Sequence, residues 1–100
     1  MAYSVEFTEY SLEDFEGLDS SLKKLASKQI LKLEQSPEYG ESLGNRDGLD
    51  LTGFYKLYFN KKKHRIVYRL IEEDDDLIAE IIAIGARDKN YVYKQAHSRK

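Results

Sequence analysis

The chain has 100 residues, of which 41% are hydrophobic, and it contains no cysteine. This length predicts one globular domain with a single core, and the absence of cysteine excludes disulfides and thiolate metal sites. No N-terminal apolar segment resembles a signal peptide, and no apolar run approaches the roughly 20 residues of a membrane span. We therefore expect a cytoplasmic protein that does not associate with a membrane.

The net charge is −2, but the two halves of the chain differ in sign. Residues 1–50 hold 5 Lys and Arg against 11 Asp and Glu, whereas residues 51–100 hold 11 against 7. An overall negative charge argues against a general nucleic-acid binder, but the positive second half indicates a polyanionic partner for that half.

The first third of the chain predicts a strand followed by two helices. Residues 3–7 alternate as a short strand does, and Thr8 is placed to cap a short helix that breaks at Gly17. A longer helix follows, capped by one of the polar residues 19–21 and ended by Pro37, because the residue before proline disfavours the helical conformation. Its apolar stripe consists of Leu22, Leu25, Ala26, Ile30 and Leu33.

Residues 37–53 are predicted to form a loop, because glycines stand at positions 40, 44, 48 and 53. No Gly-Lys-Ser/Thr pattern follows, so it is not a phosphate-binding loop. We expect Leu43, Leu49 and Leu51 to attach this loop to the core.

Residues 53–70 predict a β-hairpin with a polar turn at residues 60–63. Pairing across this turn places Phe59 opposite His64 and Tyr58 opposite Arg65. One face of the hairpin then carries Tyr55, Leu57, Phe59, Ile66, Tyr68 and Leu70, and the other carries Lys56, Tyr58, Arg65, Val67 and Arg69. The second face is either a surface that binds a phosphodiester or a solvated outer face, and the hairpin alone favours the solvated face.

The remainder predicts an acidic turn, a buried strand and a last helix. The five carboxylates of residues 72–76 are adjacent and rarely converge on one ion, so we expect no metal site and no cofactor. Residues 77–84 are almost continuously apolar, as in a central strand buried on both faces. Asp88 or Asn90 is placed to cap a final helix in which Val92 and Ala96 face inward.

The predicted fold is therefore α+β, in the order β-α-α-β-β-β-α. It has a small antiparallel sheet of about four strands, two N-terminal helices packed on one face, and a short C-terminal helix.

Four residues are expected to meet at one end of this sheet. Arg87 follows the central strand, Lys56 and Arg65 come from the hairpin, and Tyr93 lies one or two helical turns beyond Arg87. RNA cleavage by its own 2′-hydroxyl needs a base, cations that offset charge on the phosphorane, and a proton for the leaving oxygen. A lysine crowded by arginines is a candidate base, and arginine binds phosphate bidentately.

The two histidines are weaker candidates for this chemistry. His64 falls on the apolar face of the hairpin, which favours a core or edge position. His97 lies one turn beyond Tyr93, which is equally consistent with a place near the site and with a surface position.

The segments LDLTGFYKLYF, HRIVYRL, IIAIGARDKNYVYKQA and SLKKLASKQILKLEQSP together resemble the RelE family of bacterial toxins, within the wider RelE/ParE superfamily. The resemblance covers nearly the whole chain. It implies a metal-independent, ribosome-dependent endoribonuclease that cuts mRNA in the ribosomal A site, and a cognate antitoxin that neutralises it.

The resemblance also implies roles for individual residues. Lys56 would be a base or phosphate contact, Arg65 would hold the scissile phosphate, Arg87 would stabilise the phosphorane or the leaving oxygen, and Tyr93 would stack on or orient the substrate nucleotide. The further RNA contacts that we expect are Tyr58, Arg69, Lys61, Lys62, Lys63, Lys89 and His97.

Two positions depart from the family pattern. Tyr58 stands where well-studied relatives have a second lysine, and Ala86 stands where they tend to have a basic residue. We therefore expect weaker electrostatic help, a different cleavage preference or an attenuated enzyme.

Two alternatives remain open at this stage. A ParE-like toxin would inhibit DNA gyrase by binding, and a non-catalytic module would use the same residues for stability. The nuclease hypothesis predicts that Lys56, Arg65, Arg87 and Tyr93 are solvent-accessible in one shallow basic cleft. For the antitoxin, the charge map predicts an acidic and hydrophobic segment that covers the basic face or displaces the helix at residues 91–100.

Overall fold

The computed structural model describes residues 2–46 and 48–100. Five strands form one sheet in the spatial order β1-β5-β4-β3-β2. The strands are β1 Ala2–Phe7, β2 Glu41–Arg46, β3 Leu49–Phe59, β4 His64–Glu73 and β5 Asp76–Ala86. The predicted α+β class and the order of the helices are confirmed.

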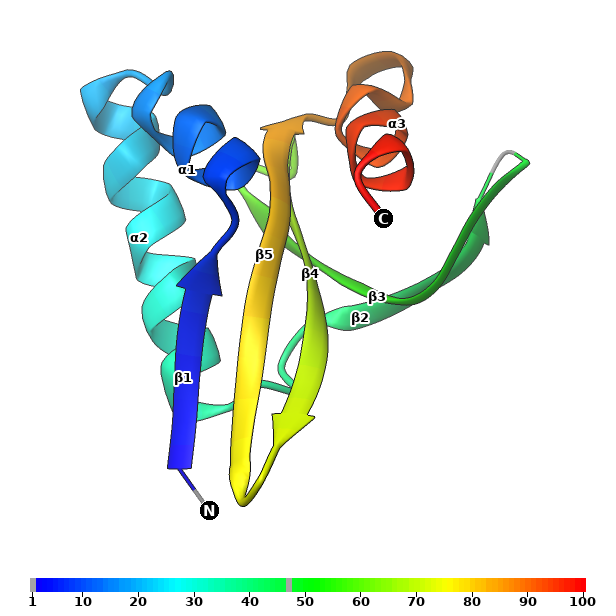
Figure 1. Cartoon of the computed structure of the whole chain (residues 1–100). Helices are drawn as coiled ribbons and strands as arrows, with labels where there is room; N and C mark the ends of the chain where they lie inside the picture. Colours follow the sequence, from blue (N-terminus) through cyan, green and yellow to red (C-terminus); the bar gives the residue numbers. More distant parts are fainter. Residues whose placement is uncertain (1, 47) are drawn as a thin grey trace.

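Two helices cover one face of this sheet and one covers the other (Figure 1). Helices α1 Glu9–Glu16 and α2 Ser20–Gln35 follow β1, and α3 Tyr91–Ser98 follows β5 through a short 3₁₀ turn at Asp88–Asn90. Thr8 and Ser11 cap α1 reciprocally, and Asp19 caps α2 by accepting from the amide of Leu22. The predicted caps of α1 and α2 are thereby confirmed. Asn90 holds the N-cap position of α3 but makes no side-chain capping hydrogen bond there.

The sheet differs from the prediction in two ways. It has five strands rather than about four, and it is mixed rather than antiparallel, because β1 pairs with β5 in parallel. The pairing joins the two ends of the chain, and a parallel pair needs a long intervening connection rather than a tight turn. Pairing over so large a separation leaves no local signal in the sequence.

The segment predicted as a loop at residues 37–53 instead contains β2 and the start of β3. The two strands pair antiparallel, with an irregularity between Ser42 and Gly44. Gly44 and Gly48 have positive φ values of 65° and 81°, which glycine adopts without strain. The glycines therefore bend a β-ribbon rather than prevent one, and Leu43 and Leu51 are buried as expected.

The hairpin register is the predicted one, with Tyr58 opposite Arg65 and Phe59 opposite His64. Its apolar face packs against α2, in a core that includes Leu57, Ile66 and Tyr68. The opposite face is not the solvated surface that the hairpin alone favoured. A second core lies there, in which Val67 packs with α3 and with β2 and β3, which curve toward that helix (Figure 1). As predicted, β5 is buried on both faces, and Val92 and Ala96 face inward.

An ion pair fastens the end of α3 to the opposite layer. Asp14 of α1 accepts from the backbone amide of Ile84 (3.1 Å) and from Nη1 of Arg99 (2.6 Å). The same guanidinium donates to the carbonyl of Ile82 (3.0 Å). One arginine beyond α3 thus connects both helical layers to β5.

The hydroxyl of Tyr68 holds the chain between α2 and β2. It donates to the carbonyl of Pro37 (3.0 Å) and accepts from the amide of Gly40 (2.8 Å). Burial raises the pKa of Tyr68 to about 12. A Cβ at position 40 would collide with this hydroxyl and lie 2.7 Å from the carbonyl oxygen of Lys56, so glycine is required there for space.

We expect Arg99→Ala to lower the free energy of unfolding by about 2 kcal/mol, the size of a hydrogen bond to a charged group. Chemical denaturation measures this change, and hydrogen exchange should show faster opening of α3. Lys94→Ala, which removes an exposed cation from the same helix, is the matched control and should leave both unchanged. Equal stability of the Arg99 and Lys94 variants would contradict this role.

Tyr68→Phe should cost about 1–3 kcal/mol of unfolding free energy, because it leaves the amide of Gly40 and the carbonyl of Pro37 without this partner. Tyr39→Phe removes a hydroxyl from an exposed ring on the same connection and should cost little. Thermal or urea unfolding of the two variants compares them directly. A Tyr68 variant as stable as the Tyr39 variant would show that the two hydrogen bonds do not fix this segment.

Candidate functional site

Tyr58 lies at the centre of a group of cations on the α3 side of the hairpin. From the centroid of its ring, Cζ of Arg65 is 4.0 Å away, Nζ of Lys56 is 4.9 Å away and Nζ of Lys62 is 5.4 Å away. The alternation of β3 and the register with β4 place Lys56, Tyr58 and Arg65 on one face, and Lys62 reaches the ring from the hairpin turn. We call Lys56, Tyr58, Lys62 and Arg65 the Tyr58 cluster.

Arg65 connects this cluster to α3 and to the hairpin turn. Its Nε donates to the hydroxyl of Tyr93 (3.1 Å), and its Nη1 donates to the carbonyls of Lys62 and His64. These acceptors compensate for burial of the charge, since Arg65 is only 4% exposed. The predicted meeting of Arg65 with Tyr93 is therefore present in the fold.

The prediction that all four catalytic candidates are solvent-accessible is wrong for three of them. Lys56, Arg65 and Tyr93 are 6%, 4% and 1% exposed, whereas Arg87 is exposed. The physical reason is that α3 packs onto this face through Val92, Tyr93 and Ala96 and forms the second core there. The sequence around the hairpin predicts an outer surface for its polar face, because helix α3, which packs there, lies far along the chain.

Arg87 lies beside the hairpin turn, at the same end of the sheet as the Tyr58 cluster. Its backbone amide donates to the carbonyl of Lys63 (3.0 Å). Gly85, which stands two residues before Arg87, pairs with Arg65 of β4. A groove of about 450 Å³ is formed there by Lys61, Lys62, Lys63, His64, Ala86, Arg87 and Asp88. The exposed cations Lys61–Lys63 and Arg87 thus form a positive rim next to the buried Lys56 and Arg65.

The other predicted RNA contacts are distributed unevenly. Lys89 is exposed in the turn directly after Arg87, and His97 is half-buried in α3 one turn beyond Tyr93. Arg69 lies farther along β4, where it forms an ion pair with Glu80 (2.7 Å). The fold therefore does not bring Arg69 to the groove.

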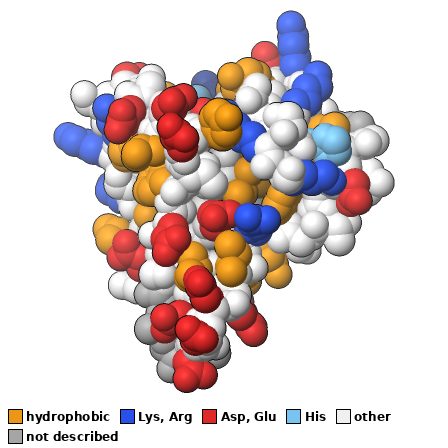
Figure 2. Space-filling model, in the orientation of Figure 1, with side chains coloured by type: hydrophobic (Ala, Val, Ile, Leu, Met, Phe, Trp, Pro, Cys, Tyr) orange, Lys and Arg blue, Asp and Glu red, His pale blue; other side chains and the backbone are white. Residues whose placement is uncertain are grey.

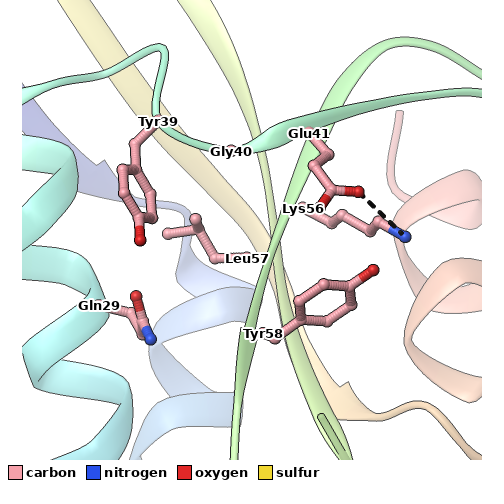
Figure 3. Close-up of a pocket in the computed structure, with 7 residues that line it drawn as sticks. All are labelled: Gln29, Tyr39, Gly40, Glu41, Lys56, Leu57 and Tyr58. Carbon is pink, nitrogen blue, oxygen red and sulfur yellow. Dashed lines mark ion pairs between the residues drawn. The ribbon is translucent and has the colours of Figure 1, made fainter.

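A smaller hollow of about 210 Å³ borders the cluster on the side of β2 (Figure 3). It is lined by Gln29, Tyr39, Gly40, Glu41, Lys56, Leu57 and Tyr58. The Oε2 atom of Glu41 lies 3.9 Å from Nζ of Lys56, because β2 pairs these two residues. Glu41 was missed at the level of sequence, since it stands in the glycine-containing segment that predicted a loop.

The surroundings of Tyr58 lower the pKa of its hydroxyl from the ordinary value of a tyrosine. The hydrogen bond with Lys56 lowers the pKa of Tyr58 most, and the charges of Lys56 and Arg65 lower it further. Desolvation and the carboxylate of Glu41 oppose this change and raise the pKa of the hydroxyl.

Acidic side chains occur over much of the face in Figure 2 but are densest at one end. Carboxylates crowd the lower end in Figure 2, where the β4–β5 turn carries the acidic residues 72–76, and the Lys and Arg side chains lie above it.

Within residues 2–46 and 48–100, no group of three or more His, Asp or Glu side chains is arranged to hold a metal ion. In that same part of the chain, no helix is both long and apolar enough to cross a bilayer.

This arrangement defines a small α+β protein with a cationic site at one end of its sheet, and comparison with known proteins identifies its class. Residues 5–91 match the family model described as the ParE toxin of the type II toxin–antitoxin system parDE, and the chain belongs to this family.

Two kinds of relative extend this result. The mRNA interferase toxin RelE of Escherichia coli K12 is 28% identical over 101 residues, covering 99% of this chain and 98% of RelE. The free structure of an E. coli RelE variant with two arginines replaced by alanine has a TM-score of 0.71 at 25% identity, covering 99% and 98% of the two chains. The same variant bound to a peptide of the antitoxin RelB has a TM-score of 0.64 at 25% identity, covering 96% and 95%.

Burial of His64 makes the free energy of unfolding depend on pH. Burial lowers the pKa of His64 below its ordinary 6.5. The Nδ2 amide of Asn60 lies 3.1 Å from Nδ1, which suits a neutral ring that accepts there. Just below pH 6.5 the unfolded chain binds this proton more readily than the folded chain, so the free energy of unfolding should fall as pH drops through that window.

The measurement is unfolding free energy against pH for the wild type and for His64→Gln. The variant should show a flatter dependence below pH 6.5 because its side chain does not titrate. Asp19 and Asp50, whose pKa values are lowered by hydrogen bonds, change protonation below 3.8 and do not interfere in this window. Identical slopes for the two proteins would contradict the burial effect.

Proposed function

We propose that this chain is a toxin that cleaves mRNA on the ribosome, in the ribosomal A site, and that a cognate antitoxin neutralises it. The single observation that carries the proposal is the convergence of Lys56, Arg65, Tyr93 and the groove of Arg87 at one end of the sheet. Whole-length similarity to E. coli RelE, which is named an mRNA interferase toxin, supports the same function.

The chemistry of the site suits RNA cleavage without a metal ion. Attack by the 2′-oxygen on the adjacent phosphorus adds negative charge to the phosphoryl oxygens, and fixed cations stabilise that charge. Arg65 is held rigidly by its three protein acceptors, which makes it suited to position a phosphate. Arg87 is exposed on the rim, where it is suited to reach the phosphorane or the leaving 5′-oxygen.

Substrate would approach where the cluster opens to solvent. Tyr58 is half-buried and borders the hollow beside Glu41, and Lys61–Lys63 stand on the rim of the groove with Arg87. Exposed cations attract the RNA backbone. The burial of Lys56 and Tyr93 implies that they act from beneath this rim and not as its outermost contacts.

The antitoxin would bind the same charged end. RelB is a peptide partner of the E. coli RelE variant. For this chain we propose an acidic and hydrophobic segment that covers Lys61–Lys63 and Arg87. Such a segment would compete with the RNA backbone for the same cations.

A second candidate is inhibition of DNA gyrase by binding, and the description of the matched family as a ParE toxin favours it. The two functions differ in what they demand of Arg87. A nuclease needs this cation at the phosphate, whereas a gyrase inhibitor needs only a binding surface. A gyrase supercoiling assay on the wild type decides whether this second activity exists.

Arg87→Ala should reduce cleavage of a defined mRNA on stalled ribosomes by about 100-fold or more, the typical loss when one group that stabilises developing charge is removed. Primer extension maps the cut, and free mRNA serves as the control for dependence on the ribosome. Stability should be unchanged because this side chain is exposed.

Lys28→Ala is the matched control, since it removes an exposed cation from α2 on the other face of the sheet. It should cleave like the wild type. A folded wild-type protein that makes no ribosome-dependent cut would overturn the nuclease proposal and favour inhibition of DNA gyrase instead. An Arg87 variant that cuts normally would remove this residue from the mechanism.

A further inference from the structure

Tyr58 presents its hydroxyl in a strongly cationic environment to which five elements contribute. Lys56 comes from its own strand β3, Lys62 from the hairpin turn, Arg65 from β4 and Glu41 from β2. Helix α3 contributes Tyr93, whose hydroxyl accepts a hydrogen bond from Nε of Arg65. Three positive charges therefore face one phenol, and one carboxylate opposes them.

The geometry assigns different tasks to the ring and to the hydroxyl. Arg65 packs against the ring at 4.0 Å, so the ring is engaged by protein cations and is poorly placed as a stacking surface for a nucleobase. The hydroxyl of Tyr58 points toward the ammonium group of Lys56 (Figure 3). Glu41 lies on the other side of that ammonium group and forms an ion pair with it. The polar end of Tyr58 is thus the chemically useful part.

We propose that Tyr58 is the catalytic base of the RNA cleavage, accepting the proton of the attacking 2′-hydroxyl. This inference rests on the proposed function and deepens it. It gives a task to a residue that sequence analysis treated only as an RNA contact in place of a missing cation. A phenolate among three cations is stabilised by the same charges that stabilise the phosphorane.

The step balances within the cluster. The phenolate oxygen of Tyr58 takes the 2′-proton, the 2′-oxygen forms a bond to phosphorus, and the bond from phosphorus to the 5′-oxygen breaks. The leaving 5′-oxygen takes a proton from the ammonium group of Lys56. The products are a 2′,3′-cyclic phosphate and a 5′-hydroxyl, and the phenol then returns its proton to the Lys56 amine.

The direction of the electrostatic effect agrees with this role. Lys56, through its hydrogen bond and its charge, and Arg65 lower the pKa of Tyr58, so a larger fraction is ionised near neutral pH than in an ordinary tyrosine. Glu41 raises the pKa of the same hydroxyl. Removing the charge of Glu41 is therefore a test with a defined sign.

The first experiment measures single-turnover cleavage on stalled ribosomes across neutral to alkaline pH. Tyr58→Phe keeps the ring and its contacts with the cations but lacks the hydroxyl, and it should cleave at least about 100-fold more slowly, the usual contribution of a general base. Its residual rate should lose the rise with pH that the wild type shows. Glu41→Gln should move that rise to lower pH.

Tyr55→Phe is the matched control on the same strand. Tyr55 lies on the opposite face of β3, stacked on Tyr68 at 5.5 Å, so its variant should keep the wild-type rate and pH profile. Thermal unfolding of both variants detects any loss of fold. A folded Tyr58→Phe protein with a wild-type rate and profile would overturn the inference while leaving the nuclease proposal intact.

A second measurement does not depend on activity. Ultraviolet titration of tyrosinate in the wild type and in Tyr58→Phe isolates one of the eight tyrosines by difference. The missing component should ionise at lower pH than the remaining phenols. A difference spectrum that ionises with the ordinary tyrosines would overturn the inference, and absence of cleavage by the wild type would overturn the proposed function together with it.

Discussion

The contacts of the Arg65 guanidinium hold together the cationic end of this protein. The guanidinium donates to the hydroxyl of Tyr93 on α3, to backbone carbonyls at the hairpin turn, and it packs on the ring of Tyr58. A single buried charge thereby links the sheet, the turn and the C-terminal helix. A buried cation is costly unless its donors are satisfied, so the same contacts that keep the fold also fix the position of the charge.

Helix α3 serves two purposes in this arrangement. It supplies Val92 and Ala96 to the second core, and its Tyr93 accepts a hydrogen bond from the buried Arg65, a residue that the sequence places on an open face. The Asp14–Arg99 ion pair holds the helix end against β5. Cations that would otherwise be hydrated are therefore preorganised beneath a rim of exposed lysines, and preorganisation is what makes fixed charge effective in catalysis.

Tyr58 departs from the family pattern, and the tertiary structure shows which groups surround it. By sequence the residue is a lost cation. In the fold, the loss is offset because Lys56, Lys62 and Arg65 surround the phenol and alter its acidity. The site keeps a positive charge balance, and the phenol that stands in place of the lysine is still a group able to exchange a proton.

The sequence alone determined the α+β class, the cap at Thr8, a cap of the second helix among residues 19–21, the register of the hairpin and the two faces that follow from it. These features depend on residues close together in the chain, where periodicity and turn chemistry act directly. The tertiary structure decided the rest: β2 within a glycine-containing segment, the parallel pairing of β1 with β5, the burial of Lys56 and the approach of Glu41 to it. The pairing of β1 with β5 joins the two ends of the chain, and such contacts are selected by burial and packing of the whole chain, which no local pattern encodes. The pairing of β2 with β3 is local, but the glycines and the irregularity of this segment give no clear strand alternation.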